Sequence, residues 1–381
     1  MTPSSRHYRV DNGDMHLFTF ESGRRLLVDI KIRCSADDPD DDTPDVATQL
    51  KKELKRDAYG RPYVDAFLLT HPDEDHICGL QEHFHLGPVD NYDAKGNKII
   101  IREMWSSPIV FRRQSRDHKL CPDACAWATE ARRRVKAHRD GKGNLDGERI
   151  MIMGEDVDGK TDDLSDILVK TGDRLTHING VDDGTFSALL LAPLPAEDDE
   201  EEELLSKNDS SVVMQLTIRS GTNAQAARYL LGGDAGVAIW ERIWRRYGKQ
   251  PDDLTYDVLV APHHCSWRSL SWDSWSGKRE KAQVSPDARD ALGQAQSGAL
   301  VVSSSCEVKD NDNDPPCIRA KREYLSIVKP KGGEFRCVAD GASDEPLVIE
   351  TNWAGPKVRR IAMGLAAVGG TGIGTEAVAH G

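Results

Sequence analysis

Apolar residues alternate with polar ones in short runs near the start of the chain. Tyr8 to Val10, His16 to Phe20 and Arg25 to Ile32 have this spacing, which is typical of β-strands. The turn-forming pairs Asn12-Gly13 and Ser22-Gly23 separate the runs. The beginning of the chain is therefore predicted to form a β-hairpin.

Helical and strand patterns alternate through much of the remaining chain. Val46 to Lys55 has helical spacing, and Val64 to Leu69 is an apolar strand that leads directly into Thr70-His71. Beyond residue 180 the pattern predicts one amphipathic helix, Val237 to Tyr247, and strands at Ser187 to Leu191, Ser211 to Ile218, Arg228 to Leu231 and Asp257 to Val260. This mixture is typical of an α/β protein.

The stretch from about residue 90 to residue 180 has little periodicity and many charged, Gly and Pro residues, with one predicted helix from Cys121 to Lys136. We interpret this stretch as an insertion around the core. The segment Gly364 to Gly381 is rich in Gly and Ala. We therefore expect one domain over residues 1–355 and a flexible tail over residues 356–381.

Composition places the chain among ordinary globular proteins. Its 381 residues have a hydrophobic fraction of 38% and a mean hydropathy of −0.55. No apolar run approaches the roughly 20 residues that cross a bilayer, so no membrane association is expected. The first residues lack the basic and then apolar pattern of a secretory signal, and a cytoplasmic location is the expectation. The eight cysteines are then expected to be free thiols.

The net charge of −13 repels polyanions at long range. Acidic residues concentrate in two blocks, Asp37 to Asp45 and Glu197 to Glu203, whereas Ala131 to Arg139 is basic. Such runs are commonly solvated loops or helix faces, although the basic stretch is also a candidate for contacting phosphate. This charge disfavours long nucleic acid and suits a small substrate or one delivered by a protein partner.

Four potential metal ligands follow one predicted strand within six residues: His71, Asp73, Asp75 and His76. Imidazole and carboxylate groups suit Zn²⁺, Mn²⁺ or iron. A solvated turn with a capping Asp is the alternative interpretation, because Pro-Asp sequences are common at helix starts.

Two further segments favour a metal site. Tyr229 to Asp234 is an apolar strand that ends in two glycines and an acid, and Val258 to His264 is another strand that ends in the pair His263-His264. Because the ends of neighbouring strands meet at one edge of a sheet, these groups are predicted to converge.

The residues after the first strand match the first motif of the metallo-β-lactamase superfamily, His-x-His-x-Asp-His, with Asp73 in place of the second His. This replacement resembles the branch that contains the hydrolase domain of the competence protein ComEC. Other segments resemble that branch in the same order along the chain: Asp11 to Asp14, Leu27 to Ile30, Asn208 to Val213, His263 to Ser266 and Ser303 to Ser305. The resemblance spans about residues 8–330 and implies a four-layer αββα sandwich with metal-dependent hydrolase activity.

The resemblance also implies two divalent metal ions, Zn²⁺ or Mn²⁺. The implied ligands are His71 and Asp73 for one ion, Asp75, His76 and either His263 or His264 for the other, and Asp234 as the bridge between them. Catalytic roles are implied for Asp75 and for His264, which would protonate a leaving oxygen or orient a phosphate. Three residues are expected to hydrogen bond the ligands or the substrate: Asn208, Ser211 and Ser266.

The chain departs from that branch at several places. Cys78 and Cys265 replace usual glycines, and the late Asn-x-x-Gly-His-Pro element is present only as Asn313 to Pro316, without its His. The segment from Asn208 to Ser211 stands where the superfamily has its middle His ligand. One metal position is therefore expected to be rich in oxygen, which favours Mn²⁺ or a weakly held second ion.

Two metal ions suit phosphodiesters, because a metal-bridged hydroxide, neutralised phosphate oxygens and a stabilised leaving group are all required. The leading hypothesis is a phosphodiesterase or nuclease that acts on nucleic acid or a smaller nucleotide. Hydrolysis of an ester, thioester, lactone or peptide bond uses the same chemistry and stays open. A catalytically degenerate binding protein also stays open. So does a cysteine nucleophile at Cys265, although adjacent side chains usually point apart.

Other conspicuous residues receive plainer interpretations. Trp267, Trp272 and Trp275 follow the His pair and either pack in the core or line a cleft where bases stack. Cys121 and Cys125 are spaced by four residues on a predicted helix but lack a partner pair, so no metal role is assigned to them.

Overall fold

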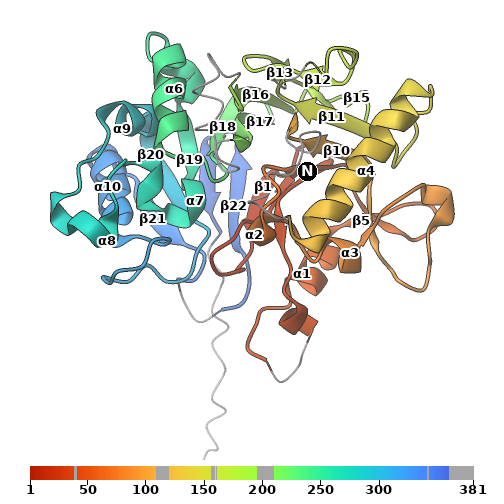
Figure 1. Cartoon of the computed structure of the whole chain (residues 1–381), viewed down its shortest axis with the longest axis horizontal. Coiled ribbons are helices and arrows are strands. Elements are labelled where there is room, and N and C mark those ends of the chain that lie inside the picture. Colours follow the sequence, from red (N-terminus) through yellow and green to blue (C-terminus); the bar gives the residue numbers. More distant parts are fainter. Residues whose placement is uncertain are drawn as a thin grey trace, which may run out of the picture.

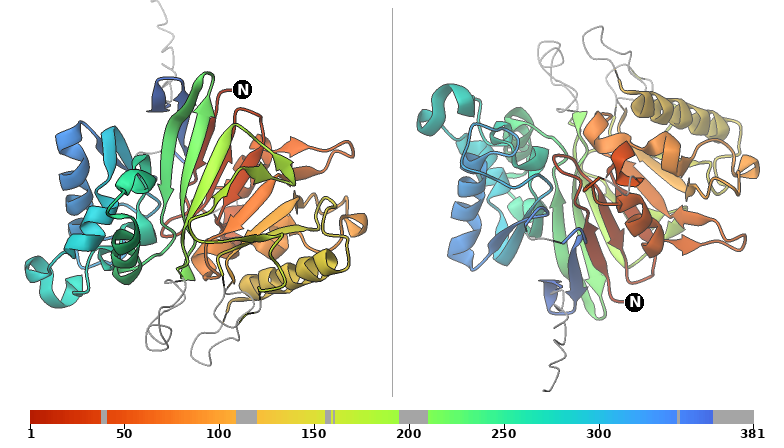
Figure 2. Two further views of the ribbon diagram at one scale, coloured as in Figure 1. Left: turned by 90° about the horizontal axis from the view of Figure 1, so that it is seen from above. Right: turned by 90° about the horizontal axis from the view of Figure 1, so that it is seen from below.

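Two large β-sheets form the centre of the molecule. A computed structural model describes residues 1–37, 41–108, 120–155, 159, 161–194, 210–340 and 343–359. The nine-stranded sheet has the order β12-β11-β10-β7-β3-β2-β1-β22-β23, and the seven-stranded sheet has the order β13-β16-β17-β18-β19-β20-β21. Figure 1 and Figure 2 show the two sheets between helices on either side.

The nine-stranded sheet combines both ends of the described chain. Its strands in chain order are β1 (Ser4–His7), β2 (His16–Thr19), β3 (Arg25–Val28), β7 (Ala66–Leu69), β10 (Glu103–Ser106), β11 (Arg149–Met153), β12 (Leu168–Val169), β22 (Leu347–Asn352) and β23 (Gly355–Val358). The expected hairpin is present in β2 and β3, which pair antiparallel. The first strand was expected at Tyr8 to Val10 but lies earlier, because β1 is Ser4–His7 and pairs antiparallel with β2.

The seven-stranded sheet contains the later strands. They are β13 (Arg174–Leu175), β16 (Phe186–Ala192), β17 (Val213–Ser220), β18 (Asn223–Leu231), β19 (Tyr256–Val260), β20 (Ala295–Ser303) and β21 (Glu334–Cys337). The smaller strands are β4 (Ile30–Lys31), β5 (Lys55–Arg56), β6 (Pro62–Val64), β8 (Phe84–His85), β9 (Ile99–Ile101), β14 (His177–Ile178) and β15 (Val181–Asp182).

Helices cover the outer face of each sheet. On the nine-stranded sheet lie α1 (Val46–Glu53), α2 (Glu74–Ile77), α3 (Leu80–His83) and α4 (Pro122–Arg139). On the side of the seven-stranded sheet lie α6 (Val237–Tyr247), α7 (Pro262–Cys265), α8 (Trp275–Lys278), α9 (Pro286–Leu292) and α10 (Ile318–Val328).

Alternation along the strands creates three apolar layers. On β3, Leu27 packs outward against the layer of α1 and α4, whereas Leu26 and Val28 face the second sheet. On β18, Leu230 packs toward α6, and Tyr229 faces the first sheet. This period of two is what allows each sheet to bury both of its faces. The expected four-layer αββα sandwich is confirmed.

The region from residue 90 to residue 180 is not an insertion around the core, and that expectation was wrong. Its segments β10, β11 and β12 extend the nine-stranded sheet in parallel with β7, and α4 packs on the same sheet. The sheet also continues through β23, past residue 355, where the domain was expected to end. Residues 360–381 lie outside the described part of the chain, as does the acidic block Glu197 to Glu203.

The structure bears on two expectations from composition, one about the cysteines and one about membrane spans. All eight cysteines are unpaired, and Cys121 accepts a hydrogen bond from Ala124 N at the start of α4. Among the described residues, no helix has the length and apolar character needed to cross a membrane.

Candidate metal centre

The candidate ligands lie where strands of both sheets end. β7, in the nine-stranded sheet, leads into Thr70 and His71. In the seven-stranded sheet, β18 leads into Asp234, and its parallel neighbour β19 leads into the pair at 263 and 264. The strand ends therefore converge at one place between the two sheets, as the sequence predicts.

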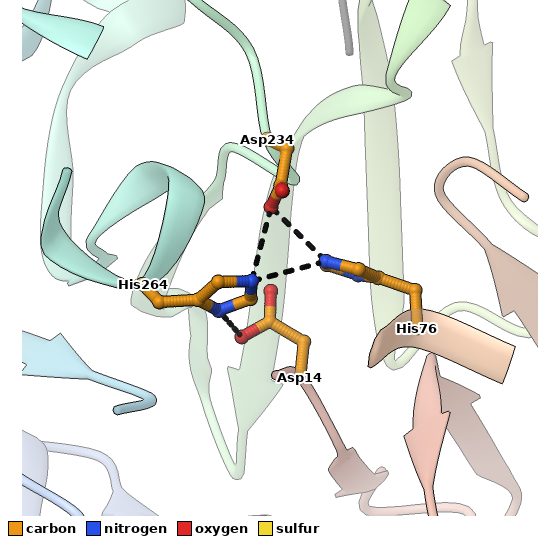
Figure 3. A group of neighbouring side chains, drawn as sticks. All are labelled: Asp14, His76, Asp234 and His264. Carbon is orange, nitrogen blue, oxygen red and sulfur yellow. Dashed lines mark hydrogen bonds and ion pairs between the residues drawn. The ribbon is translucent and has the colours of Figure 1, made fainter. Parts of the chain in front are cut away.

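Four buried side chains form the closest group. Asp14, His76, Asp234 and His264 each offer one potential ligand atom, and these atoms all lie within 4.8 Å of one another. Figure 3 shows the four side chains pointing toward one another from separate elements. Three of them are among the predicted ligands, whereas Asp14 is a further candidate that the sequence interpretation did not assign.

Asp14 is brought to the site by the loop between β1 and β2. Gly13 approaches the loop of the first motif so closely that a Cβ atom there would lie 2.7 Å from Asp75 O. Asn12 and Ser304 anchor the loop, since Asn12 donates to Pro315 O and Ser304 donates to Gly13 O. The Gly-Asp pair in the segment Asp11 to Asp14 was the signal that could have identified this residue.

The carboxylate of Asp234 faces two sets of side chains with its two oxygens. Oδ1 lies 3.0 Å from His76 Nε2 and 3.5 Å from His264 Nε2. Oδ2 lies 3.6 Å from His71 Nε2 and 3.5 Å from His263 Nε2. His263 and His264 therefore face different oxygens of the Asp234 carboxylate.

Two further carboxylates complete these sets. Asp73 Oδ2 lies 3.8 Å from His71 Nε2, and Asp75 Oδ2 lies 3.3 Å from His264 Nε2. We call His71, Asp73 and His263 the first set, and Asp14, Asp75, His76 and His264 the second set. Each set shares Asp234, and the second set contains more carboxylate.

Asp29 orients His76 through the ring nitrogen that faces away from the other candidate ligands. This buried residue follows β3 with a φ of 53°, and its Oδ2 lies 2.8 Å from His76 Nδ1. The same carboxylate accepts hydrogen bonds from Thr70 N and Thr70 Oγ1. If His76 donates its Nδ1 proton to Asp29, its Nε2 lone pair is directed at the centre of the site. The sequence interpretation noted this strand end only as part of a motif.

The turn that carries the His pair is strained. His263, His264 and Cys265 have φ values of 50°, 53° and 68°, in the left-handed region that residues other than Gly rarely occupy. Surrounding hydrogen bonds hold it, because His263 N donates to Gly233 O and Cys317 N donates to Cys265 O. Strain of this kind concentrates at functional sites.

The three residues expected to hydrogen bond ligands or substrate have different outcomes. Ser211 is buried, and its Oγ accepts from Asp234 N at 3.2 Å, so it supports the bridging carboxylate. Ser266 instead donates to Asp314 Oδ1 and caps the turn that follows the His pair. Asn208 lies outside the described residues.

The alternative with a cysteine nucleophile does not fit the environment of Cys265. This residue is fully buried, and burial raises the pKa of its thiol well above the ordinary value. A neutral and inaccessible thiol is a poor nucleophile. Of the neighbouring tryptophans, Trp267 and Trp275 are core residues and Trp272 is 68% exposed.

Electrostatics differ between the two sets. Burial lowers the pKa of His71 and of His263 in the first set, which favours neutral imidazoles. Burial alone would also lower the pKa of His264, but the Asp234, Asp14 and Asp75 carboxylates raise it to about 10. In the absence of an ion, a proton on this imidazole balances the negative charge of the second set.

Several buried polar atoms at the site have no hydrogen-bond partner among the described residues: Asp14 Oδ1, His71 Nε2, Asp234 Oδ1 and His264 Nδ1. Leaving such atoms unsatisfied is costly in a protein interior. Imidazole nitrogen and carboxylate oxygen are ligands for Zn²⁺ and Mn²⁺, and their ligation would satisfy His71 Nε2 and Asp234 Oδ1. The residues present therefore fit divalent metal ions.

Comparison with known proteins adds little to this geometry. Neither a family model nor a curated protein matches the chain. Among solved structures, the chain is similar to the crystal structure of unliganded yeast PDE1, with 11% sequence identity and a TM-score of 0.42 over 92% of this chain and 100% of that chain. A likeness this loose carries no argument about mechanism or substrate.

Proposed function

We propose that the chain is a metal-dependent hydrolase of the metallo-β-lactamase fold that cleaves phosphodiesters, in nucleic acid or in a small nucleotide. The observation that carries the proposal is the orientation of Asp234, whose two carboxylate oxygens face two separate sets of imidazole and carboxylate ligands. Two divalent ions, Zn²⁺ or Mn²⁺, would be held by these sets. When bound, such a pair lowers the pKa of water toward neutrality and neutralises phosphate oxygens.

The residues of the chain would have distinct tasks. In the first set His71 and Asp73 act as ligands, and in the second set His76 and His264 do so, with Asp29 fixing the ring of His76. The ring of His264 is fully buried, which suits a ligand better than a proton donor to substrate.

Three side chains of the centre reach solvent, among them the ligand Asp73, which is 27% exposed. Asp75 is 37% exposed, and His263 is 18% exposed. Asp75 is thus placed to contact substrate, and His263 rather than His264 is the imidazole placed to orient a phosphate or protonate a leaving oxygen.

The test combines elemental analysis of the purified protein with hydrolysis of bis-p-nitrophenyl phosphate, with and without added Mn²⁺ or Zn²⁺. We expect bound metal and turnover in the wild-type chain, and loss of turnover in Asp75→Ala and Asp234→Ala. Asp90→Ala changes an exposed carboxylate away from the site and serves as the control.

Three outcomes would contradict the proposal. Bound metal without turnover on diesters would favour a binding protein. Cleavage of p-nitrophenyl acetate without cleavage of the diester would favour an esterase. A chain that binds neither ion after reconstitution would exclude the metal-dependent mechanism altogether.

A further inference from the structure

A row of buried polar side chains leads from the metal centre into the space between the sheets. His16 Nε2 lies 3.4 Å from Asp14 Oδ1, and His7 Nδ1 lies 3.1 Å from His16 Nδ1. Ser5 Oγ lies 2.9 Å from His7 Nε2 and 3.2 Å from Tyr229 Oη. All five residues are at most 3% exposed. We refer to Asp14, His16, His7, Ser5 and Tyr229 as the buried row.

The strand pattern explains how two imidazoles come to lie in this layer. His7 on β1 is paired directly with His16 on β2, and His16 shares the inward face of its strand with Phe18. The rings of His7 and Phe18 meet edge-on, with centroids 6.3 Å apart. Burying polar rings in an apolar layer is unfavourable unless their nitrogens are hydrogen bonded. Packing alone would be served better by apolar side chains.

Short contacts between polar atoms connect Tyr229 to His16 through Ser5 and His7. Ser5 donates to Tyr229 Oη, and Ser5 Oγ also contacts His7 Nε2. His7 Nδ1 contacts His16 Nδ1, and the ring tautomers decide which nitrogen donates. His16 Nε2 faces Asp14 Oδ1 at 3.4 Å, and neither atom has a hydrogen-bond partner among the described residues. Burial, followed by the neighbouring His16, lowers the pKa of His7 well below its ordinary value, consistent with a neutral ring. The row therefore ends with a ring nitrogen that faces a carboxylate.

Asp14 stands at a junction between this row and the second set. Its Oδ1 lies between His16 Nε2 and His264 Nδ1, at 3.4 Å and 3.5 Å. Figure 3 shows the other carboxylate oxygen pointing toward the space between His264 and His76. On the side of the buried row, the side chain that faces Asp14 Oδ1 is His16.

We propose that His16, held in place by His7, positions the Asp14 carboxylate and thereby sets the metal affinity of the second set. His16 acts through Asp14 and contacts neither substrate nor ion, so it is a positioning residue. The inference rests on the metal centre proposed above. It predicts that substitutions between the sheets change metal binding in a way that depends on which ring nitrogen they replace.

The experiment uses amides that imitate one nitrogen of a histidine. The amide nitrogen of Gln reaches approximately the place of Nε2, and that of Asn reaches approximately the place of Nδ1. His16→Gln therefore retains the contact with Asp14, and His16→Asn loses it. At position 7 the order is reversed, because His7→Asn retains the contact with His16 and His7→Gln loses it.

Metal affinity is measured by titrating the metal-free full-length variants with Co²⁺, following its d–d absorption, and by elemental analysis. We expect His16→Asn and His7→Gln to lower the affinity for the second equivalent of Co²⁺ by about 10- to 100-fold. His16→Gln and His7→Asn are expected to stay close to the wild type. His177→Asn, at an exposed position, is the control, and denaturant unfolding in chelator shows whether each variant is folded.

In this crossed order, Gln is tolerated at position 16 and Asn at position 7. Such an order distinguishes a role in positioning Asp14 from a general disruption of the fold. Equal effects of Asn and Gln at both positions, or no effect of any variant on the Co²⁺ titration, would overturn the inference while leaving the proposed function intact. A wild-type chain that takes up no metal would overturn both. A chain that binds two equivalents and shows the crossed order but hydrolyses no diester would support the positioning role and reject the proposed activity.

Discussion

Asp29 illustrates how a residue outside the predicted ligand set supports the centre. Its carboxylate holds both His76 Nδ1 and the backbone of Thr70, so one buried acid connects the ends of β3 and β7. The amide of an Asn has only one acceptor oxygen and would place an NH₂ group against one of these partners. Residues that orient metal-ligating imidazoles matter nearly as much as the ligands themselves.

We expect Asp29→Asn to lower metal affinity by about 10- to 100-fold, because His76 loses the acceptor that fixes its ring. Titration of the metal-free protein with Co²⁺ measures this change. Asp65→Asn is the matched control, since Asp65 is also buried but lies before the start of β7 and accepts from Arg25 N. Equal metal affinity in Asp29→Asn and the wild type would show that His76 needs no such partner.

The sequence predicted the seven proposed ligands through one signal, the position of His and Asp directly after apolar strands. It did not reveal Asp14, Asp29 or His16, because their roles depend on which strands are neighbours. Asp29 meets His76 only because β3 pairs with β7, and His16 meets His7 only because of the register between β1 and β2. Such pairings are properties of the folded sheet.

At the scale of the element, α4 differs from its sequence interpretation as a solvated basic face. Arg134 is only 1% exposed and donates to Ile101 O and Arg149 O. Glu130, 3% exposed, pairs with both Arg133 and Arg134. The helix is therefore attached to β9 and β11 by hydrogen bonds from a buried guanidinium, whose charge Glu130 of the same helix balances, as well as by apolar contacts.

Glu130→Gln should lower the free energy of unfolding by about 3–5 kcal/mol at pH 7, because it leaves a buried guanidinium without its counter-charge. Burial alone would raise the pKa of Glu130, but the two arginines hold it below its ordinary value. The ionised carboxylate thus contributes stability that is fully present above the unfolded-state pKa of about 4.3 and is lost as the pH falls through the folded-state value.

Urea denaturation at pH 7 and between about pH 4.5 and 3.5 tests this sign, and the wild type and Glu130→Gln should converge in acid. Asp163→Asn removes the partner of Arg139 on the same helix, and because that pair is solvent exposed we expect no significant change. A gap between the wild type and Glu130→Gln that stays constant down to pH 3.5 would contradict the prediction.

Element boundaries were predictable where the pattern was long. The predicted helix from Val237 to Tyr247 has the same bounds in α6. The boundaries of the short strands between residues 90 and 180 could not be predicted, because these strands contain few residues and some of the residues are charged. Glu103, in β10, is buried at 3% and bonded to Trp105 Nε1 and Gly180 N, and nothing local in the sequence indicates these partners.

At the scale of the molecule, the candidate ligands connect the two sheets. Asp14 and His76 belong to the side of the nine-stranded sheet, whereas Asp234 and His264 belong to the seven-stranded sheet. An ion held by all four would bind the folded chain and not the unfolded one, so it would stabilise the association of the sheets.

Chelation should therefore lower the melting temperature of the metal-loaded protein by several degrees, since a ligand at 100 times its Kd contributes about 2.7 kcal/mol. Differential scanning calorimetry before and after EDTA, and after restoring Mn²⁺ or Zn²⁺, provides the measurement. Asp234→Ala should melt at one temperature whether or not EDTA is present. The prediction fails if the metal-loaded wild type is equally insensitive.

The division of the site between two sheets also has a consequence for biosynthesis. His76 and His264 are 188 residues apart in the chain. At the usual 5–20 residues per second, a ribosome needs on the order of 10 to 40 s to make the second after the first. A nascent chain therefore presents an incomplete and acidic half-site for that interval, and stable uptake of the proposed ions would follow only after the second half of the site has been made.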